Sequence, residues 1–98
     1  MGIGVPKDFE EAAKWYRMAA DQGFAKAQYN LGVCYCKGVG VPKDDIMAYM
    51  WFNLAASNGF ENAARNREIT GHGMTPAQIA ETQKLSREWQ PKNVGAPP

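Results

Sequence analysis

Apolar side chains recur at three- and four-residue steps along most of the chain, which is the spacing of amphipathic helices. Ala27, Leu31 and Tyr35 follow one another in this way and predict the packing face of a helix over residues 25–37. The segment 45–57 is apolar on almost every side, so we expect its helix to lie between neighbouring helices. Its main packing face comprises Met47, Ala48, Trp51, Leu54 and Ala55.

Residues that start or stop a helix mark the ends of these segments. Asp8 and Asp44 each stand two residues after a proline, and both are expected to be helix N-caps. Gly23 and Gly59 follow the helical runs that begin there, and each is expected to end its helix in the left-handed conformation. The chain is therefore predicted to be built from helices with short connections.

The chain repeats itself at an offset of 36 residues, which is typical of stacked supersecondary units. GIGVPKD at positions 2–8 returns as GVGVPKD at 38–44, and a looser copy follows at 71–76 after residues 60–70, which resemble the first helix of a third pair. Further matched pairs are Trp15 with Trp51, Tyr16 with Phe52, Ala19-Ala20 with Ala55-Ala56, and Gly23-Phe24 with Gly59-Phe60. Each unit is predicted to be a pair of helices joined by the Gly-x-Gly connector.

The last helix has a well-defined start and a one-sided pattern. Thr75-Pro76-Ala77-Gln78 forms a capping box with proline at the first helical position, and the helix is predicted to run to about Trp89. One stripe carries Ile79, Thr82, Leu85 and Trp89, while the opposite side is polar. A one-sided terminal helix suits the end of a capped solenoid.

The repeated pattern resembles the Sel1-like repeat, a relative of the tetratricopeptide repeat. It reads A-x-x-W-Y/F-x-x-A-A-x-x-G-x-x-x-A-Q-Y-N-L-G-x-x-Y-x-x-G-x-G-V-P-x-D, with one near-complete cycle in residues 2–38 and much of another in residues 38–60. The resemblance implies an all-α fold, namely a short right-handed α-solenoid of antiparallel helix pairs with about five helices. It implies a domain over residues 1–90, with units of about 2–37 and 38–70 and a C-terminal cap over 71–90. The tail, 91–98, is expected to be disordered.

Sel1-like proteins are generally adaptors or regulators, so the resemblance implies a protein–protein interaction module, without enzymatic activity or a cofactor. In tetratricopeptide-like solenoids the first helix of each pair lines the concave surface. By this resemblance the binding surface comprises Lys26, Tyr29, Asn30, Val33 and Cys36, followed by Asn62, Arg65, Asn66 and Ile69. The mixture of aromatic, amide and cationic groups suits a protein or peptide. Any single one of these residues fits an ordinary exposed face equally well.

The first helix is predicted to lack a cover on one side, because the sequence opens at a connector with no helix before it. The apolar residues left on that side are Phe9, Ala12, Trp15 and Tyr16. An uncovered apolar face tends to find a partner. We expect either a homo-oligomer formed through the N-terminal helix or an upstream segment that covers it. A fragment of a longer structural scaffold is a further hypothesis.

The charge and the hydropathy of the sequence argue against some classes of partner and location. The formal net charge is +1 and the charges are interleaved, which argues against a nucleic-acid partner. No apolar run approaches the roughly 18 residues of a membrane span, and residues 1–15 lack the features of a signal peptide. As written, the sequence fits a cytoplasmic protein with no membrane insertion, while an incomplete N-terminus would leave export open.

Candidate chemistry is sparse. The Gly-x-Gly loops lack the third glycine of a dinucleotide fingerprint and follow a helix, which favours a structural joint. Trp15, Trp51 and Trp89 recur once per unit and are predicted core residues rather than a stacking set. Cys34 and Cys36 lie on opposite sides of a helix and cannot pair with each other. With His72 they are the only soft metal ligands, short of a zinc set, so no metal is predicted. The alternative is a small metal- or redox-dependent regulator or enzyme that uses these three residues.

Overall fold

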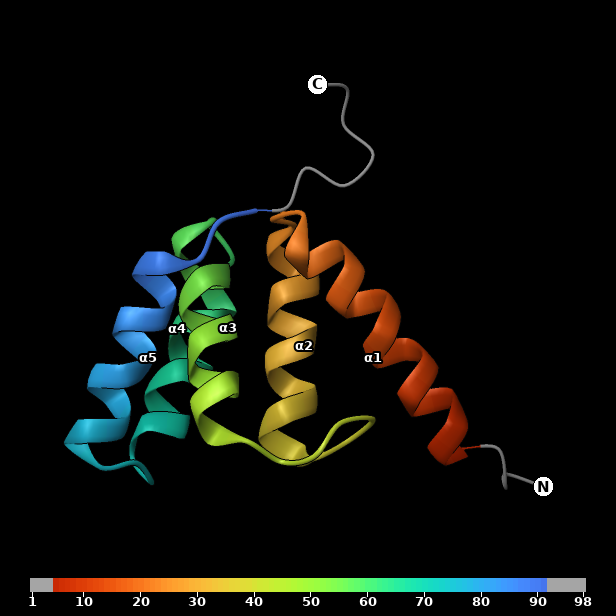
Figure 1. Cartoon of the computed structure of the whole chain (residues 1–98), viewed down its shortest axis with the longest axis horizontal. Coiled ribbons are helices and arrows are strands. Elements are labelled where there is room, and N and C mark those ends of the chain that lie inside the picture. Colours follow the sequence, from red (N-terminus) through yellow and green to blue (C-terminus); the bar gives the residue numbers. More distant parts are fainter. Residues whose placement is uncertain (1–4, 92–98) are drawn as a thin grey trace.

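The computed structural model describes residues 5–91, and this part of the chain is made of five helices and no strand (Figure 1). The prediction of an all-α fold with about five helices is confirmed. The tail predicted over 91–98 lies outside the described residues from position 92 onward. The helices are α1 (Val5–Asp21), α2 (Ala25–Lys37), α3 (Asp45–Ser57), α4 (Glu61–Gly71) and α5 (Pro76–Glu88).

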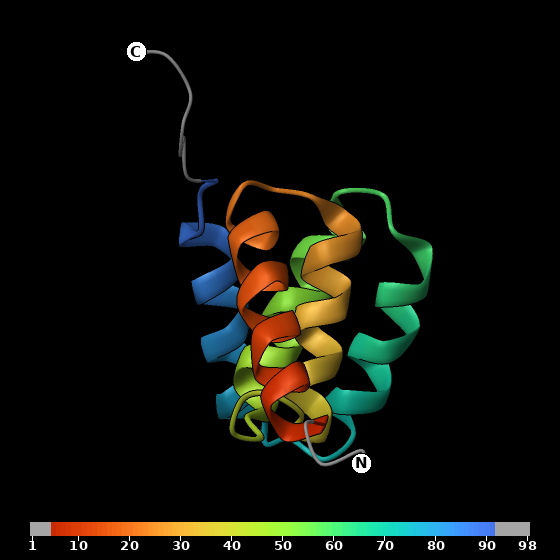
Figure 2. The ribbon, with the colours of Figure 1, turned by 90° about the vertical axis from the view of Figure 1, so that its right-hand side faces the viewer.

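Consecutive helices run antiparallel, and α3 lies in the centre of the array (Figure 1). It packs against α2, α4 and α5, while α1 packs against α2 at one end. Figure 2 shows α1, α3 and α5 on one side of the array, with α2 and α4 beside them. This arrangement is an α-solenoid, and it explains why the α3 sequence is apolar almost all round.

The core is built on α3. Trp51 and Phe52 are 1% exposed, and they point into two different clusters. Trp51 packs with Ala27 and Leu31 of α2, and its ring lies edge-on to that of Trp89 at 6.0 Å between centroids. Phe52 packs instead with the alanines that bring α4 close, Ala48, Ala55 and Ala63. The predicted packing faces of α2 and α3 are confirmed.

Glycines end two of the helices as predicted. Gly23 and Gly59 have φ values of 98° and 96°, and each follows the last turn of its helix. Gly38 closes α2 at φ 70°, and its N–H donates to the carbonyl of Cys34. These positive φ values lie in the left-handed region that only glycine adopts at little cost.

The predicted N-cap at Asp8 is wrong, because α1 begins three residues earlier, at Val5. Asp44 does cap α3, and its carboxylate accepts the N–H of Met47 at 3.1 Å. The two sites share the letters PKD, but Gly40, at φ 78°, turns the chain back from α2 toward α3 and leaves Asp44 extended. Pro6 fits the first turn of α1, where its missing N–H is not needed.

The prediction that Trp15 is a core residue is also wrong. Its side chain is 65% exposed, although Trp51 at the same position of the next unit is 1% exposed. Trp51 lies between α2 and α5, whereas no helix of residues 5–91 covers the side chain of Trp15. Trp89 is half-buried against the core.

Helix α5 has the predicted capping box, in which Thr75 and Gln78 exchange hydrogen bonds of 3.1 Å and 2.9 Å. Thr82 is fully buried, and Leu85 packs against the α3 core. The outer side of the helix is exposed at Glu81, Gln83, Lys84, Arg87 and Glu88. Helix α5 therefore covers α3 and presents a polar surface. None of the described helices is long and apolar enough to span a bilayer.

The two copies of the PKD sequence give a matched test of capping. We expect Asp44→Ala to lower the free energy of unfolding by about 1 kcal/mol, because the N–H of Met47 loses its acceptor. Asp8→Ala should cost no more than about 0.5 kcal/mol, because this residue lies inside the first turn of α1, where its carboxylate interacts favourably with the helix dipole. Urea denaturation of both variants measures the difference, and equal losses would contradict the observed helix starts.

Candidate functional site: a groove along the second and fourth helices

Two hollows lie side by side along α2, and together we call them the α2–α4 groove. The hollow between α1 and α2 has a volume of about 450 Å³, and the one between α2 and α4 has a volume of about 160 Å³. They share Val33 and Lys37, which stand one helical turn apart on α2. The first is also lined by Phe9, Ala12, Tyr16, Asn30, Cys34 and Val39, and the second by Cys36, Phe52, Asn66, Ile69 and Thr70.

The two hollows are equivalent positions of consecutive repeat units. At the 36-residue offset, Tyr16 corresponds to Phe52, Asn30 to Asn66, Val33 to Ile69 and Cys34 to Thr70. Each hollow thus has an aromatic ring, an amide, a branched aliphatic side chain and a small side chain. The sequence repeat therefore produces two surface hollows lined by the same kinds of side chain. One extended partner segment could contact both hollows in the same way.

Most side chains that line the groove are apolar, and its charged lining residue is a cation. Lys37 lines both hollows, and neither contains an aspartate or glutamate among its lining residues. Its ammonium group is exposed at the last turn of α2, where a cation is favourable next to the helix carbonyls. Ile69 is 62% exposed, so it presents a large aliphatic side chain on the surface beside the smaller hollow.

Contacts between helices hold one wall of the groove in place. The hydroxyl of Tyr29 accepts a hydrogen bond from the side-chain amide of Asn66 at 3.0 Å. Its ring lies 4.7 Å from that of Phe60 and 5.8 Å from that of Phe52, measured between centroids. These contacts join α2 to α3 and to α4. Both Tyr29 and Asn66 are predicted binding residues, and the structure gives them internal partners as well.

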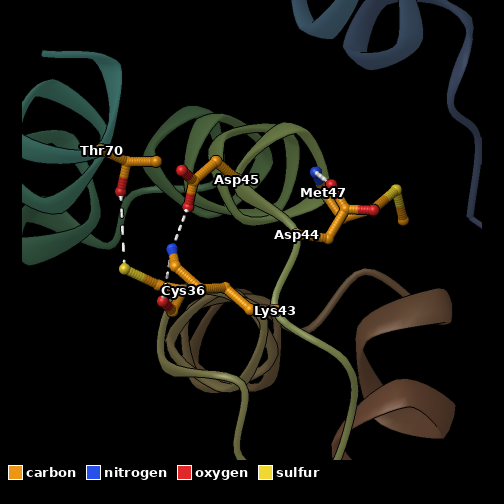
Figure 3. A network of polar contacts seen from close by, with 6 residues as sticks. All are labelled: Cys36, Lys43, Asp44, Asp45, Met47 and Thr70. Atoms are coloured by element: carbon orange, nitrogen blue, oxygen red, sulfur yellow. Dashed lines mark hydrogen bonds and ion pairs between the residues drawn. The ribbon is translucent and has the colours of Figure 1, made fainter. Parts of the chain in front are cut away.

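The C-terminal end of α2 is tied to α3 and α4 (Figure 3). The ammonium group of Lys43 donates to the carboxylate of Asp45 at 2.8 Å and to the carbonyl of Cys36 at 3.2 Å. The hydrogen bond to Asp45 raises the pKa of Lys43 above its usual value. The thiol of Cys36 lies 3.9 Å from the hydroxyl of Thr70 on α4. These contacts hold the last turn of α2, which carries Lys37, next to α3 and α4.

The structure brings part of the predicted binding set together. Asn30, Val33, Cys36, Asn66 and Ile69 all line the groove. The other four predicted residues lie on the same two helices but do not line either hollow: Lys26, Asn62 and Arg65 are exposed, and Tyr29 is partly buried.

The residues predicted for self-association are divided between two surfaces. Phe9, Ala12 and Tyr16 line the hollow between α1 and α2 and so belong to the groove. Trp15 does not line it and is exposed elsewhere on α1.

Sequence reasoning missed several groove residues: Cys34, Lys37, Val39, Phe52 and Thr70. The signal that could have found two of them is the repeat itself, since Cys34 and Thr70 correspond at the same offset as Val33 and Ile69.

The alternative based on Cys34, Cys36 and His72 gains no support from the geometry. Cys34 is a buried free thiol. Its burial raises its pKa, so the reactive thiolate form is disfavoured. His72 is exposed at the end of α4. In the described part of the chain, no three His, Cys, Asp or Glu residues are grouped so as to hold a metal ion.

The glycine-rich connector also forms a hollow, of about 460 Å³, next to the start of α1. It is lined by Phe9, Glu10 and residues 38–42, so its one charged lining residue is a carboxylate. A carboxylate repels a phosphate, and the connector is better explained as a structural joint between helices.

Repeated helix pairs, a central buried helix and a groove that recurs with the repeat define an α-solenoid repeat protein. The chain belongs to the Sel1 repeat family, whose model matches residues 1–24 and 25–60. Proteins built from Sel1 repeats generally mediate protein–protein interactions and are typically non-enzymatic scaffolds.

The fold is similar to that of a protective antigen present in uropathogenic Escherichia coli strains, whose crystal structure displays an SLR fold. The two share 38% sequence identity with a TM-score of 0.81. The match covers 85% of this chain and 18% of that chain, so this chain spans less than a fifth of the structure that it matches. No curated protein sequence gave a significant match.

Proposed function

We propose that the chain is an adaptor module that binds an extended segment of a partner protein in the α2–α4 groove. The observation that carries this proposal is the repetition of the groove: two hollows with corresponding residues lie on either side of Val33 and Lys37. Peptide-binding surfaces commonly use pockets at regular steps for alternate side chains of an extended ligand. The general role of Sel1 repeats in protein–protein interaction supports the same conclusion.

The lining residues indicate what such a segment would contain. Apolar side chains would fill the two hollows, against the aromatic rings of Tyr16 and Phe52. The amides of Asn30 and Asn66 lie at matching positions and can donate and accept hydrogen bonds with a peptide backbone. An acidic side chain of the partner would face Lys37, because no carboxylate of this chain lines the groove to neutralise that cation.

A phage-displayed library of random linear peptides, selected on the 98-residue chain, provides the probe. We expect the enriched peptides to carry two apolar residues and an acidic residue. Ile69→Glu should weaken the best peptide at least about tenfold, because a carboxylate would occupy the smaller hollow. Lys37→Glu should weaken it and also reverse the preference for acidic residues. Fluorescence anisotropy measures both affinities.

Met18→Glu is the matched control, since it also places a carboxylate at an exposed apolar position of a helix. Met18 lines neither hollow, so this variant should bind the peptide as the unchanged chain does. Selected peptides whose affinity is insensitive to Ile69→Glu and Lys37→Glu, or a selection that enriches nothing, would contradict the proposal.

A further inference from the structure

A hollow of about 290 Å³ lies between α1, α2 and the connector, and we call it the Tyr35 hollow. It shares no lining residue with either hollow of the α2–α4 groove. The exposed apolar side chains on the outer face of α1, Trp15 and Met18, do not line it either. The Tyr35 hollow is therefore a separate feature of the first repeat unit.

The walls of the Tyr35 hollow are mainly apolar, and its rim is charged. The ring and the hydroxyl of Tyr35 form part of the wall, and the aliphatic part comes from Ala13, Leu31 and Val41. Three exposed charged residues follow one another at helical steps along α1 and form the rim: Glu10, Lys14 and Arg17. A ligand would therefore contact an apolar wall and a charged edge at the same time.

The next repeat unit fills the corresponding position with one of its own rings. At the 36-residue offset, Ala13 corresponds to Tyr49 and Tyr35 corresponds to Gly71. Tyr49 is 9% exposed, and its ring lies 3.1 Å from the position that a Cβ on Gly71 would take. The ring of Tyr49 thus occupies the space that the small side chain of Ala13 leaves open in the first unit.

A charged planar group completes the filling in the second unit. Leu31 corresponds to Arg67, and Arg17 corresponds to Asn53. The guanidinium of Arg67 donates to the side-chain oxygen of Asn53 at 2.9 Å. The first unit cannot form this hydrogen bond, because Leu31 has no polar group. A position that a ring and a charged planar group fill in one unit is therefore a hollow in the other.

The following helix closes this position in the second unit. The side chain of Ile79, on α5, lies 3.8 Å from the same Cβ position of Gly71. Helix α3 does not pack along α1 as α5 packs along α3. The Tyr35 hollow is therefore left open where a closer α3 would cover it, on the side of α1 that faces the following helices.

We propose that the Tyr35 hollow binds a small aromatic carboxylic acid. The ring of the ligand takes the place that Tyr49 fills in the second unit, against Ala13 and Tyr35. Its carboxylate lies at the rim between Lys14 and Arg17, where the second unit has the uncharged Met50 and Asn53.

The orientation of the ligand follows from the charges at the rim. Asp21 accepts from the Nε of Arg17 at 3.2 Å to each carboxylate oxygen, and a guanidinium carries further N–H donors on its two terminal nitrogens. The guanidinium carbon lies 5.8 Å from the centre of the Trp51 ring, which holds Arg17 next to the core. Glu10 also lines the hollow beside the connector, so it repels a carboxylate toward Arg17.

Four probes of similar size separate the contribution of the ring from that of the charge. They are phenylpropionate, its neutral amide, the cation phenylethylamine, and hexanoate, which has no ring. Each is titrated into the chain labelled with ¹³C in its leucine methyl groups, at Leu31, Leu54 and Leu85. We expect phenylpropionate to shift the Leu31 signals saturably with a Kd of roughly 1–10 mM. The other three probes should bind at least about threefold more weakly.

Three variants of the chain test the location. Lys14→Glu should weaken phenylpropionate about fivefold or more, because an attractive charge becomes a repulsive one. Lys84→Glu is the matched control, since it makes the same change at an exposed position of α5 that does not line the hollow. Ala13→Tyr restores the side chain of the second unit and should abolish binding. Lys14 is exposed, so Lys14→Glu keeps the test valid if Ala13→Tyr does not fold.

Any of three results would overturn the proposal. The first is the absence of a saturable Leu31 shift at about 20 mM phenylpropionate, well above the expected Kd. The second is an affinity for phenylethylamine that equals the affinity for phenylpropionate, or an affinity that Lys14→Glu leaves unchanged. The third is tighter binding of a blocked peptide with phenylalanine next to aspartate, which would make a partner protein the source of the ring and the acid. None of these results bears on the α2–α4 groove, because the two sites share no residue.

Discussion

Trp51→Ala is expected to lower the free energy of unfolding by about 3–5 kcal/mol, the usual cost of truncating a buried tryptophan. Trp51 is 1% exposed and contacts Ala27, Leu31 and Trp89, so its loss leaves a cavity where α2, α3 and α5 meet. A domain of this size has about 5–15 kcal/mol of stability, so the variant should be largely unfolded well below the melting temperature of the unchanged chain. Thermal unfolding followed by circular dichroism measures the effect.

Trp15→Ala is the matched control, because it removes the same side chain at the same position of the preceding unit. Trp15 is 65% exposed, so this change should cost less than about 1 kcal/mol. Similar losses for the two variants would mean that Trp15 is covered in the isolated chain. That result would contradict the packing described for α1.

Gly40→Ala is expected to cost about 3 kcal/mol, from two sources of similar size. Gly40 has φ 78°, and an alanine held in the left-handed region costs about 1–2 kcal/mol. The new Cβ would also overlap the carbonyl group of Phe9, 2.9 Å from its carbon, and a backbone cannot move aside as a flexible side chain can. Because this contact seats α1 on the connector, the variant should also open the hollow lined by Phe9 and Val39. Urea denaturation gives the stability.

Gly59→Ala measures the conformational cost without the steric overlap. Gly59 has φ 96°, but a Cβ there would meet no atom within 4 Å. This variant should lose only the conformational part, about 1–2 kcal/mol. If Gly40→Ala is no more harmful than Gly59→Ala, the connector does not contact α1 as described.

The parts of the fold that could be predicted from the sequence are those fixed by local chemistry. The capping box at Thr75, the glycines that follow α1 and α3, and the apolar pattern of α3 each depend on residues a few positions apart. The start of α1 was mispredicted because Asp8 and Asp44 have the same neighbours in sequence. What distinguishes them is the turn at Gly40, which packs against the backbone of α1.

The exposure of Trp15 shows the same limit. A residue in a repeat is buried by the unit before it as well as by its own, so its sequence environment alone predicts a core position. The binding surface was predicted only in part, because the sequence indicates which residues share a helix face but not how neighbouring helices are spaced. The spacing of Val33, Asn66 and Ile69 gives the face of a helix, whereas the depth of a hollow depends on how far apart neighbouring helices stand. Lys37 was missed because its contact with both hollows follows from that separation.

The central claim is that the α2–α4 groove binds an extended segment of a partner. The most direct test is a map of amide chemical-shift changes in the ¹⁵N-labelled chain on addition of the tightest peptide selected from the library. We expect the largest changes at Val33, Lys37 and Ile69, which lie on both sides of the groove, and little change along α5. Changes confined to α5 or to the outer face of α1, with none at Val33, Lys37 and Ile69, would contradict it.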